Sequence, residues 1–228
     1  MSTQLPLAFK AGQDHRFIDF LGQDALRTAL EQTAEGLQPH HVFLFGATGS
    51  GKTHLLRAAA GHALALNRSA AYVPLARMAA MLPEILDSLD NHDLICLDDL
   101  QAIAGVPSAE VALFHFYNRA SANGCRFLFA ANAMPAALSI GLPDLVSRLE
   151  QGLRLTLEVL DEHGKRQVIA RRAANRGLQM DEAVLDFLFA RISRDLHTLS
   201  GVLDRLDQAS LAAQRRLTVP FIKTVLQV

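Results

Sequence analysis

The sequence predicts an α/β domain built on a parallel sheet, followed by a small all-helical domain. Apolar runs typical of buried strands alternate with helical patterns as far as residue 157. The first of these runs stops at a glycine-rich segment that begins at Gly46, and from residue 161 onward every apolar pattern has the helical period. The expected parts are a tail over residues 1–12, an α/β domain over residues 13–158 and a helical domain over residues 159–228.

The individual strands and helices follow from the period of the apolar residues. A strand that is buried on both faces needs apolar side chains on both, so it reads as an uninterrupted apolar run. Such runs predict strands over residues 42–45, 70–74, 94–97 and 127–130, and a last strand is expected over residues 153–157, LRLTL. Apolar spacings of three and four predict helices over residues 22–35, 52–66, 78–89, 108–122, 142–149, 162–176, 181–192, 195–215 and 219–227.

The overall composition suits a globular chain and limits the partners that it can bind unaided. Hydrophobic residues make up 50% of the 228 residues and charged residues 20%, and the formal net charge is −1. A domain that holds duplex DNA by its phosphates usually carries a clear excess of Lys and Arg, so autonomous DNA binding is not expected. The two cysteines lack metal-type spacing, and no apolar run has the roughly 20 residues that span a bilayer. With no signal-peptide pattern at the start, we expect a cytoplasmic protein without membrane contact.

Residues 46–53, GATGSGKT, match the phosphate-loop pattern GxxxxGK[ST] at every fixed position. Glycines in such a loop let backbone N–H groups point at phosphate oxygens, and the helix that begins at Lys52 adds the positive end of its dipole. Lys52 is expected to reach the β and γ phosphates, and Thr53 to offer its hydroxyl to Mg²⁺. The alternative is a glycine-rich turn that carries Lys-Thr by coincidence. The residues expected to contact ATP or ADP are Gly46, Thr48, Gly49, Ser50, Gly51, Lys52, Thr53 and His54.

A second signal is the apolar strand over residues 94–97, which ends in Asp98 and Asp99. Parallel strands present their carboxyl ends at one edge of the sheet, so these carboxylates are expected beside the phosphate loop. Asp98 would then help to hold Mg²⁺, and Asp99 would orient or deprotonate an attacking water. A strand that ends in a solvated Asp-Asp turn is the structural alternative.

Two further polar residues have a functional and a structural interpretation that spacing alone leaves open. Asn132 follows an apolar strand, where its side chain can touch a γ-phosphate or an attacking water, but a turn before Pro135 explains it equally well. Arg148 stands near the end of an expected helix and can project into the nucleotide site of a neighbouring protein. Spacing by itself favours an i, i+4 ion pair between Arg148 and Asp144.

The tail contains an alternating apolar segment over residues 4–9, Gln-Leu-Pro-Leu-Ala-Phe. Such a segment can dock on a partner in extended form, with Leu5, Leu7 and Phe9 entering pockets. Packing of the tail on its own domain is equally compatible with the pattern.

Together these motifs resemble the AAA+ branch that contains the replication initiator DnaA, and more closely the Hda family of DnaA regulatory inactivators. The resemblance covers nearly the whole chain and is most specific in its C-terminal part. The segments that carry it are residues 46–56 (GATGSGKTHLL), 97–105 (LDDLQAIAG), 116–119 (FYNR), 141–149 (GLPDLVSRL) and 203–220 (LDRLDQASLAAQRRLTVP).

This resemblance implies an AAA+ module whose helical part is the lid. Arg148 aligns with the arginine finger of the family and Asn132 with its sensor 1 position. The tail is similar to the hexapeptide by which Hda proteins dock on the DNA polymerase III sliding clamp. The implied clamp contacts are Gln4, Leu5, Leu7 and Phe9. The implied function is negative regulation of replication initiation, in which the nucleotide-bound protein stimulates ATP hydrolysis by DnaA and has weak ATPase activity of its own.

One position departs from the family pattern. His197 stands where the lid usually carries the sensor 2 arginine, and a neutral imidazole cannot hold a phosphate as a guanidinium does. The chain also ends at Val228, where the initiator would begin its DNA-binding domain, which argues against an origin-binding initiator. A homodimer is compatible with the sequence. An AAA+ helicase loader with its own DNA-stimulated ATPase and a stand-alone P-loop enzyme, such as a small-molecule kinase, stay open as alternatives.

Overall fold

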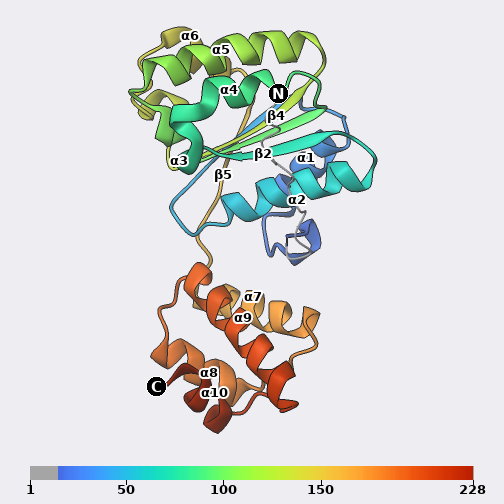
Figure 1. Cartoon of the computed structure of the whole chain (residues 1–228), viewed down its shortest axis with the longest axis vertical. Helices are drawn as coiled ribbons and strands as arrows, with labels where there is room; N and C mark the ends of the chain where they lie inside the picture. Colours follow the sequence, from blue (N-terminus) through green and yellow to red (C-terminus); the bar gives the residue numbers. More distant parts are fainter. Residues whose placement is uncertain (1–14, 228) are drawn as a thin grey trace, which may run out of the picture. The chain divides into compact units, whose positions relative to one another are not determined.

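The computed structural model describes residues 15–227, which divide into two compact units between Glu158 and Val159 (Figure 1). No helix within this described range is both long enough and apolar enough to cross a bilayer. Outside the described residues lie the four expected clamp contacts of the tail, Gln4, Leu5, Leu7 and Phe9.

The first unit is a five-stranded parallel sheet with helices on both faces, which confirms the predicted fold class (Figure 1). Its strands are β1 (His41–Phe45), β2 (Ala70–Pro74), β3 (Leu94–Asp98), β4 (Arg126–Ala131) and β5 (Leu153–Thr156). Its α-helices are α1 (Asp24–Ala34), α2 (Lys52–Ala65), α3 (Leu75–Met78), α4 (Leu82–Asp87), α5 (Pro107–Ala122) and α6 (Pro143–Glu150). Its 3₁₀ helices are η1 (Phe17–Asp19), η2 (Ala79–Met81), η3 (Leu100–Ile103) and η4 (Pro135–Ala137).

The order of the strands across the sheet is β2-β3-β4-β1-β5. Strand β1 therefore runs between β4 and β5, and Phe43 lies opposite Phe129 on one side and Arg154 on the other. Strand β4 separates β1 from β3. Because all strands are parallel, the segments that leave the carboxyl ends of β1, β3 and β4 meet at one edge of the sheet.

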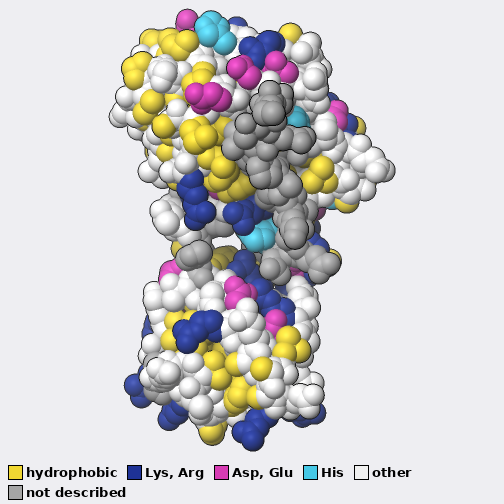
Figure 2. All heavy atoms as spheres, in the orientation of Figure 1, with side chains coloured by type: hydrophobic (Ala, Val, Ile, Leu, Met, Phe, Trp, Pro, Cys, Tyr) yellow, Lys and Arg dark blue, Asp and Glu magenta, His cyan; other side chains and the backbone are white. Residues whose placement is uncertain are grey.

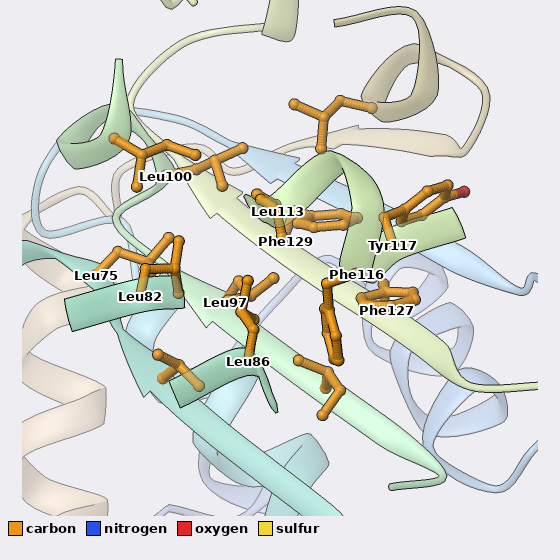
Figure 3. Packing of buried hydrophobic residues seen from close by; sticks show 14 of the residues in the cluster. Leu75, Leu82, Leu86, Leu97, Leu100, Leu113, Phe116, Tyr117, Phe127 and Phe129 are labelled. Carbon is orange, nitrogen blue, oxygen red and sulfur yellow. The ribbon is translucent and has the colours of Figure 1, made fainter. Parts of the chain in front are cut away.

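The central strands β1, β3 and β4 read as apolar runs, but their side chains divide between two cores according to odd and even positions. Phe127 and Phe129 of β4 belong to the core that α3, α4, α5 and α6 cover, whereas Leu128 belongs to the core under α1 and α2. Figure 3 shows Phe116 and Tyr117 of α5 lying over the two phenylalanines. The rings of Phe127 and Phe129 stack with centroids 5.5 Å apart and planes 2° apart. Burial on both faces thus explains why no polar residue interrupts β1, β3 and β4 between their ends, whereas the edge strand β5 carries the exposed Arg154.

The second unit is all-helical, as predicted, with α7 (Glu162–Asn175), α8 (Glu182–Arg191), α9 (Leu196–Ala213) and α10 (Val219–Leu226). Two of its helices begin at an aspartate N-cap, since Asp161 accepts a hydrogen bond from Gly164 N at 2.7 Å and Asp181 from Val184 N at 2.9 Å. On the face shown in Figure 2, Lys and Arg side chains of this unit are interspersed with Asp and Glu. Ion pairs accompany this mixing, such as the one between Arg166 and Asp186 at 2.7 Å.

The prediction of one helix over residues 78–89 is wrong. The structure has three short pieces over residues 75–87, namely α3, η2 and α4. Pro83 lies in the first turn of α4. A proline has no backbone N–H and its ring clashes with the preceding helical turn, so a helix can begin at this position but cannot run through it.

The stacked phenylalanines predict a large loss of stability when one of them is truncated. Phe129 is fully buried, and its ring centroid lies 6.2 Å from those of both Phe43 and Tyr117. We expect Phe129→Ala to lower the free energy of unfolding by about 3–5 kcal/mol, as measured by chemical denaturation. Val111 on α5 is 42% exposed, so Val111→Ala should change it by less than about 1 kcal/mol. Equal losses in the two variants would contradict the assignment of the core.

Candidate functional site

The loop over residues 46–51 joins the carboxyl end of β1 to the N-terminus of α2. A Cβ added at Gly46 would lie 2.4 Å from the backbone oxygen of Leu157, so no side chain fits there. Gly49 and Gly51 have φ values of +82° and +101°, in the left-handed region that favours glycine. The first glycine of the motif is therefore required by close packing and the other two by backbone conformation.

Lys52, at the first position of α2, folds back over this loop. Its Nζ donates hydrogen bonds to Gly46 O at 2.7 Å, to Ala47 O at 2.8 Å and to Ser50 Oγ at 3.4 Å. The residue is only 9% exposed. Burial lowers the pKa of the Lys52 ammonium, and the carboxylates of Asp98 and Asp99 act in the opposite direction. The loop thus surrounds a cation whose present partners are neutral oxygens, which an anion can replace.

Asp98, the last residue of β3, lies beside the loop, as the sequence predicts. It is 1% exposed, and its Oδ2 accepts hydrogen bonds from Thr53 Oγ1 at 2.7 Å and from the Tyr72 hydroxyl at 2.8 Å. Its Oδ1 accepts one from the backbone N–H of Asp99 at 3.0 Å. Carboxylate and hydroxyl oxygens are the ligands that Mg²⁺ prefers. Asp98 and Thr53 therefore fit a magnesium site next to a phosphate loop.

Tyr72 on β2 is a site residue that the sequence analysis missed. Burial, and after it the charge of Asp98, raises the pKa of the Tyr72 phenol, so the hydroxyl stays protonated and donates. The guanidinium carbon of Arg57 lies 4.9 Å from the centre of the Tyr72 ring. The only signal in the sequence is a phenol within an apolar strand, which by itself points to no partner.

Asp99 and Asn132 are connected through a side chain that the sequence analysis did not single out. Gln101 Nε2 donates to Asp99 Oδ1 at 3.0 Å, and Gln101 Oε1 accepts from the backbone N–H of Asn132 at 3.2 Å. Asp99 itself has φ +58°, a left-handed conformation that costs a non-glycine residue of order 1 kcal/mol. The side-chain amide of Gln101 therefore links the end of β3 to the end of β4.

His54 is directed to the segment that precedes α1. Its Nε2 lies 3.1 Å from the backbone oxygen of Arg16, and its ring stacks on those of His15 and Phe20. The Phe20 ring also lies 3.1 Å from a Cβ built at Gly51. This imidazole therefore ties the first described residues to the start of α2.

Arg148 lies on α6, and among the described residues it makes no hydrogen bond to the phosphate loop. Leu145 and Leu149 on the same helix are fully buried, whereas the Arg148 side chain is half-exposed. Its Nη1 donates to Gln151 Oε1 at 3.4 Å. Within the described part of the chain Arg148 forms no ion pair with Asp144, so the i, i+4 pair favoured by spacing is not formed.

The helical unit contains the position expected for sensor 2. The side chain of His197 is outside the part of the chain that the structure describes. Arg194, the nearest arginine in sequence, forms an ion pair with Glu162 at 2.5 Å within the same unit. Its charge is therefore already used inside the helical unit.

Comparison with known families divides the chain at the same place as the structure. The family described as "Bacterial DnaA ATPAse domain" matches residues 21–156, and the family described as "Hda, lid domain" matches residues 161–226. The chain belongs to the DnaA-related AAA+ family. An uncharacterised protein of Haemophilus influenzae is 40% identical to this family member over 99% of both chains.

Solved structures agree with this DnaA-related fold. Domain III of the initiator DnaA from Thermotoga maritima has a TM-score of 0.78 against this chain. The two are 22% identical, over 94% of this chain and 96% of that domain. AMPPCP-bound DnaA from Aquifex aeolicus gives a TM-score of 0.71 at 22% identity, over 88% of this chain and 67% of that one. The crystal structure of a DNA replication initiation factor gives a TM-score of 0.71 at 21% identity, and this chain covers 66% of its length. The chain thus spans about two thirds of the longer initiator structures, and these likenesses establish the fold alone.

Proposed function

We propose that this DnaA-related protein is a nucleotide-bound regulator that docks on the sliding clamp and stimulates ATP hydrolysis by DnaA. The observation that carries the proposal is the state of Arg148. Its helix is anchored by two fully buried leucines, while its guanidinium is half-exposed and forms no ion pair with the described residues. An arginine on a rigid support with an uncommitted charge suits insertion into a partner's phosphate site.

In the proposed nucleotide site, the loop amides and Lys52 bind the phosphates of ATP or ADP. Lys52 Nζ exchanges its bonds to Gly46 O and Ala47 O for bonds to phosphate oxygens. Thr53 and Asp98 hold Mg²⁺, which neutralises phosphate charge when bound. DnaA structures similar to this chain contain AMPPCP, which supports a nucleotide as the ligand.

Asp99 and Asn132 take the proposed catalytic positions of this chain's own site. Asp99 would accept a proton from an attacking water, and Asn132 would orient that water. The Asp99 carboxylate already accepts a hydrogen bond from Gln101 Nε2, so an attacking water would have to compete with this amide for Oδ1. This arrangement supports weak hydrolysis by the chain itself and a main role as activator of DnaA.

For the activation step, Arg148 enters the nucleotide site of DnaA and stabilises the charge that develops on the γ-phosphoryl group. An arginine finger supplied in trans is worth roughly 10³–10⁵ in rate. The tail residues Gln4, Leu5, Leu7 and Phe9 would hold the regulator on the clamp, and thereby raise its local concentration near clamp-bound partners.

Nucleotide affinity is expected to fall as the pH rises through an alkaline window set by Lys52. Burial lowers the pKa of Lys52 in the free protein, and phosphate oxygens beside the ammonium would raise it in the complex. Between these two pKa values, binding takes up a proton. Titration calorimetry of ADP in two buffers of different ionisation enthalpy measures this uptake. In Lys52→Arg the guanidinium keeps its proton, so the same uptake in that variant would contradict the assignment.

Clamp docking is tested by replacing the polar residue that opens the hexapeptide. We expect the wild-type protein to bind immobilised sliding clamp, and Gln4→Ala to bind at least about 10-fold more weakly, because it loses an anchor of the docked strand. Thr3→Ala, one residue earlier, is the matched control and should bind like the wild type. Absence of clamp binding by the wild type, together with DNA-stimulated hydrolysis of its own ATP, would instead indicate a helicase loader.

The finger is tested by Arg148→Ala in an assay of ATP hydrolysis by DnaA with DNA-loaded clamp. Stimulation should fall by about 10³-fold or more, while ADP binding and clamp binding stay unchanged. Arg154 on β5 is also an exposed arginine of the first unit, so Arg154→Ala controls for loss of a positive charge. Unchanged stimulation by Arg148→Ala would rule out the finger.

A further inference from the structure

Glu110, in the first turn of α5, is a buried carboxylate outside the site described above. It is 3% exposed, and both of its oxygens accept hydrogen bonds from backbone N–H groups. Oε1 accepts from Gly105 at 2.9 Å and from Gly141 at 3.1 Å, and Oε2 accepts from Leu142 at 2.9 Å. No Lys or Arg of the described residues pairs with it. Burying a charge without a cation is costly, so these three donors are what makes the position tolerable.

The three donors belong to two different chain segments that leave the catalytic edge of the sheet. Gly105 ends the segment that runs from Asp99 through η3. Gly141 and Leu142 end the segment that runs from Asn132 through η4. One carboxylate therefore joins the loop that follows β3 to the loop that follows β4.

The second of these segments leads directly into the helix that carries Arg148. Leu142 is the N-cap residue of α6, and Pro143 is its first residue. A negative charge at this end also suits the dipole of α6, as it suits the first turn of α5. Arg148 follows Leu142 by six residues, or about 9 Å along the helix axis. A small tilt at the N-terminus of α6 therefore displaces the guanidinium by about an ångström, and misplacement on that scale can cost about 10²-fold in rate.

We propose that Glu110 is a positioning residue for Arg148: it fixes the start of α6 and sets the finger relative to the loop that carries Asp99. This inference rests on the proposed finger role of Arg148. Glu110 touches no substrate and acts through α6. Because Oε1 is shared between Gly105 and Gly141, a shift in the loop after Asp99 is passed on to the N-terminus of α6. The state of the protein's own nucleotide site and the placement of its finger are thereby coupled.

The test is a double-variant cycle of Glu110→Gln and Arg148→Ala in the DnaA hydrolysis assay with DNA-loaded clamp. Glutamine keeps the shape, but its amide N–H₂ cannot accept a hydrogen bond. At the Oε2 position it breaks the bond from Leu142 N at the start of α6, and at the Oε1 position it breaks the bonds from Gly105 N and Gly141 N. We expect Glu110→Gln to lower the maximal stimulated rate by about 10- to 100-fold, with the half-saturating concentration of the regulator unchanged. Combining it with Arg148→Ala should give no further loss, because both changes act through the same guanidinium.

A matched control is Glu150→Gln, which removes the same charge from the last residue of α6 and leaves the Glu110 bonds in place. It should stimulate DnaA like the wild type. If Glu110→Gln does not fold, Glu110→Asp replaces it in the cycle, since the shorter side chain keeps the charge but cannot reach both loops. The same loss of maximal rate is expected.

The outcomes separate the two proposals. If Arg148→Ala itself leaves stimulation unchanged, the finger role fails, and the positioning role that rests on it fails too. If Arg148→Ala abolishes stimulation but the Glu110 variants stimulate normally, only the positioning role is overturned. A double variant that is slower than Arg148→Ala alone would also overturn it, because Glu110 would then act by a route that does not pass through Arg148.

Discussion

The placement of one buried carboxylate constrains the edge of the sheet at which the phosphate loop lies. Asp98 is almost fully buried at the end of β3, where a charge is tolerated only if its oxygens are hydrogen-bonded. Thr53 from α2 and Tyr72 from β2 supply two of those bonds. The carboxylate therefore fixes the start of α2, and with it the phosphate loop, relative to two neighbouring strands. Because Lys52 is the first residue of α2, its position is fixed together with the start of that helix.

Glu110 solves the same physical problem in a different way. Its donors are backbone N–H groups from two loops, whereas those of Asp98 include two side-chain hydroxyls. When a hydroxyl rotates away, the carboxylate oxygen that it occupied becomes free to bind a metal ion. Bonds from backbone amides can be broken only by moving the chain. The first carboxylate is thus suited to exchange ligands, and the second to hold its surroundings still.

Much of the fold follows from local sequence patterns, and the part that does not depends on contacts distant in sequence. The buried strands were predictable because both faces need apolar side chains, and the phosphate loop because glycine conformations and a cation recur at fixed spacing. The position of β4 between β1 and β3 has no local signal. Tyr72, Gln101 and Glu110 were missed for the same reason, since each is defined by partners 26, 31 or 32 positions away. The broken helix before Asp87 was predictable from Pro83, and the apolar spacing concealed it.

The close approach of Gly46 to the oxygen of Leu157 separates two pressures that act on the same motif. A side chain at position 46 is excluded by a neighbouring strand end, whatever the loop binds. In a descendant that had lost its ligand, natural selection would still retain this glycine for packing, while the lysine six residues later would be free to drift. The presence of Gly46 therefore indicates only that the fold is kept, whereas the presence of Lys52 indicates that phosphate binding is kept.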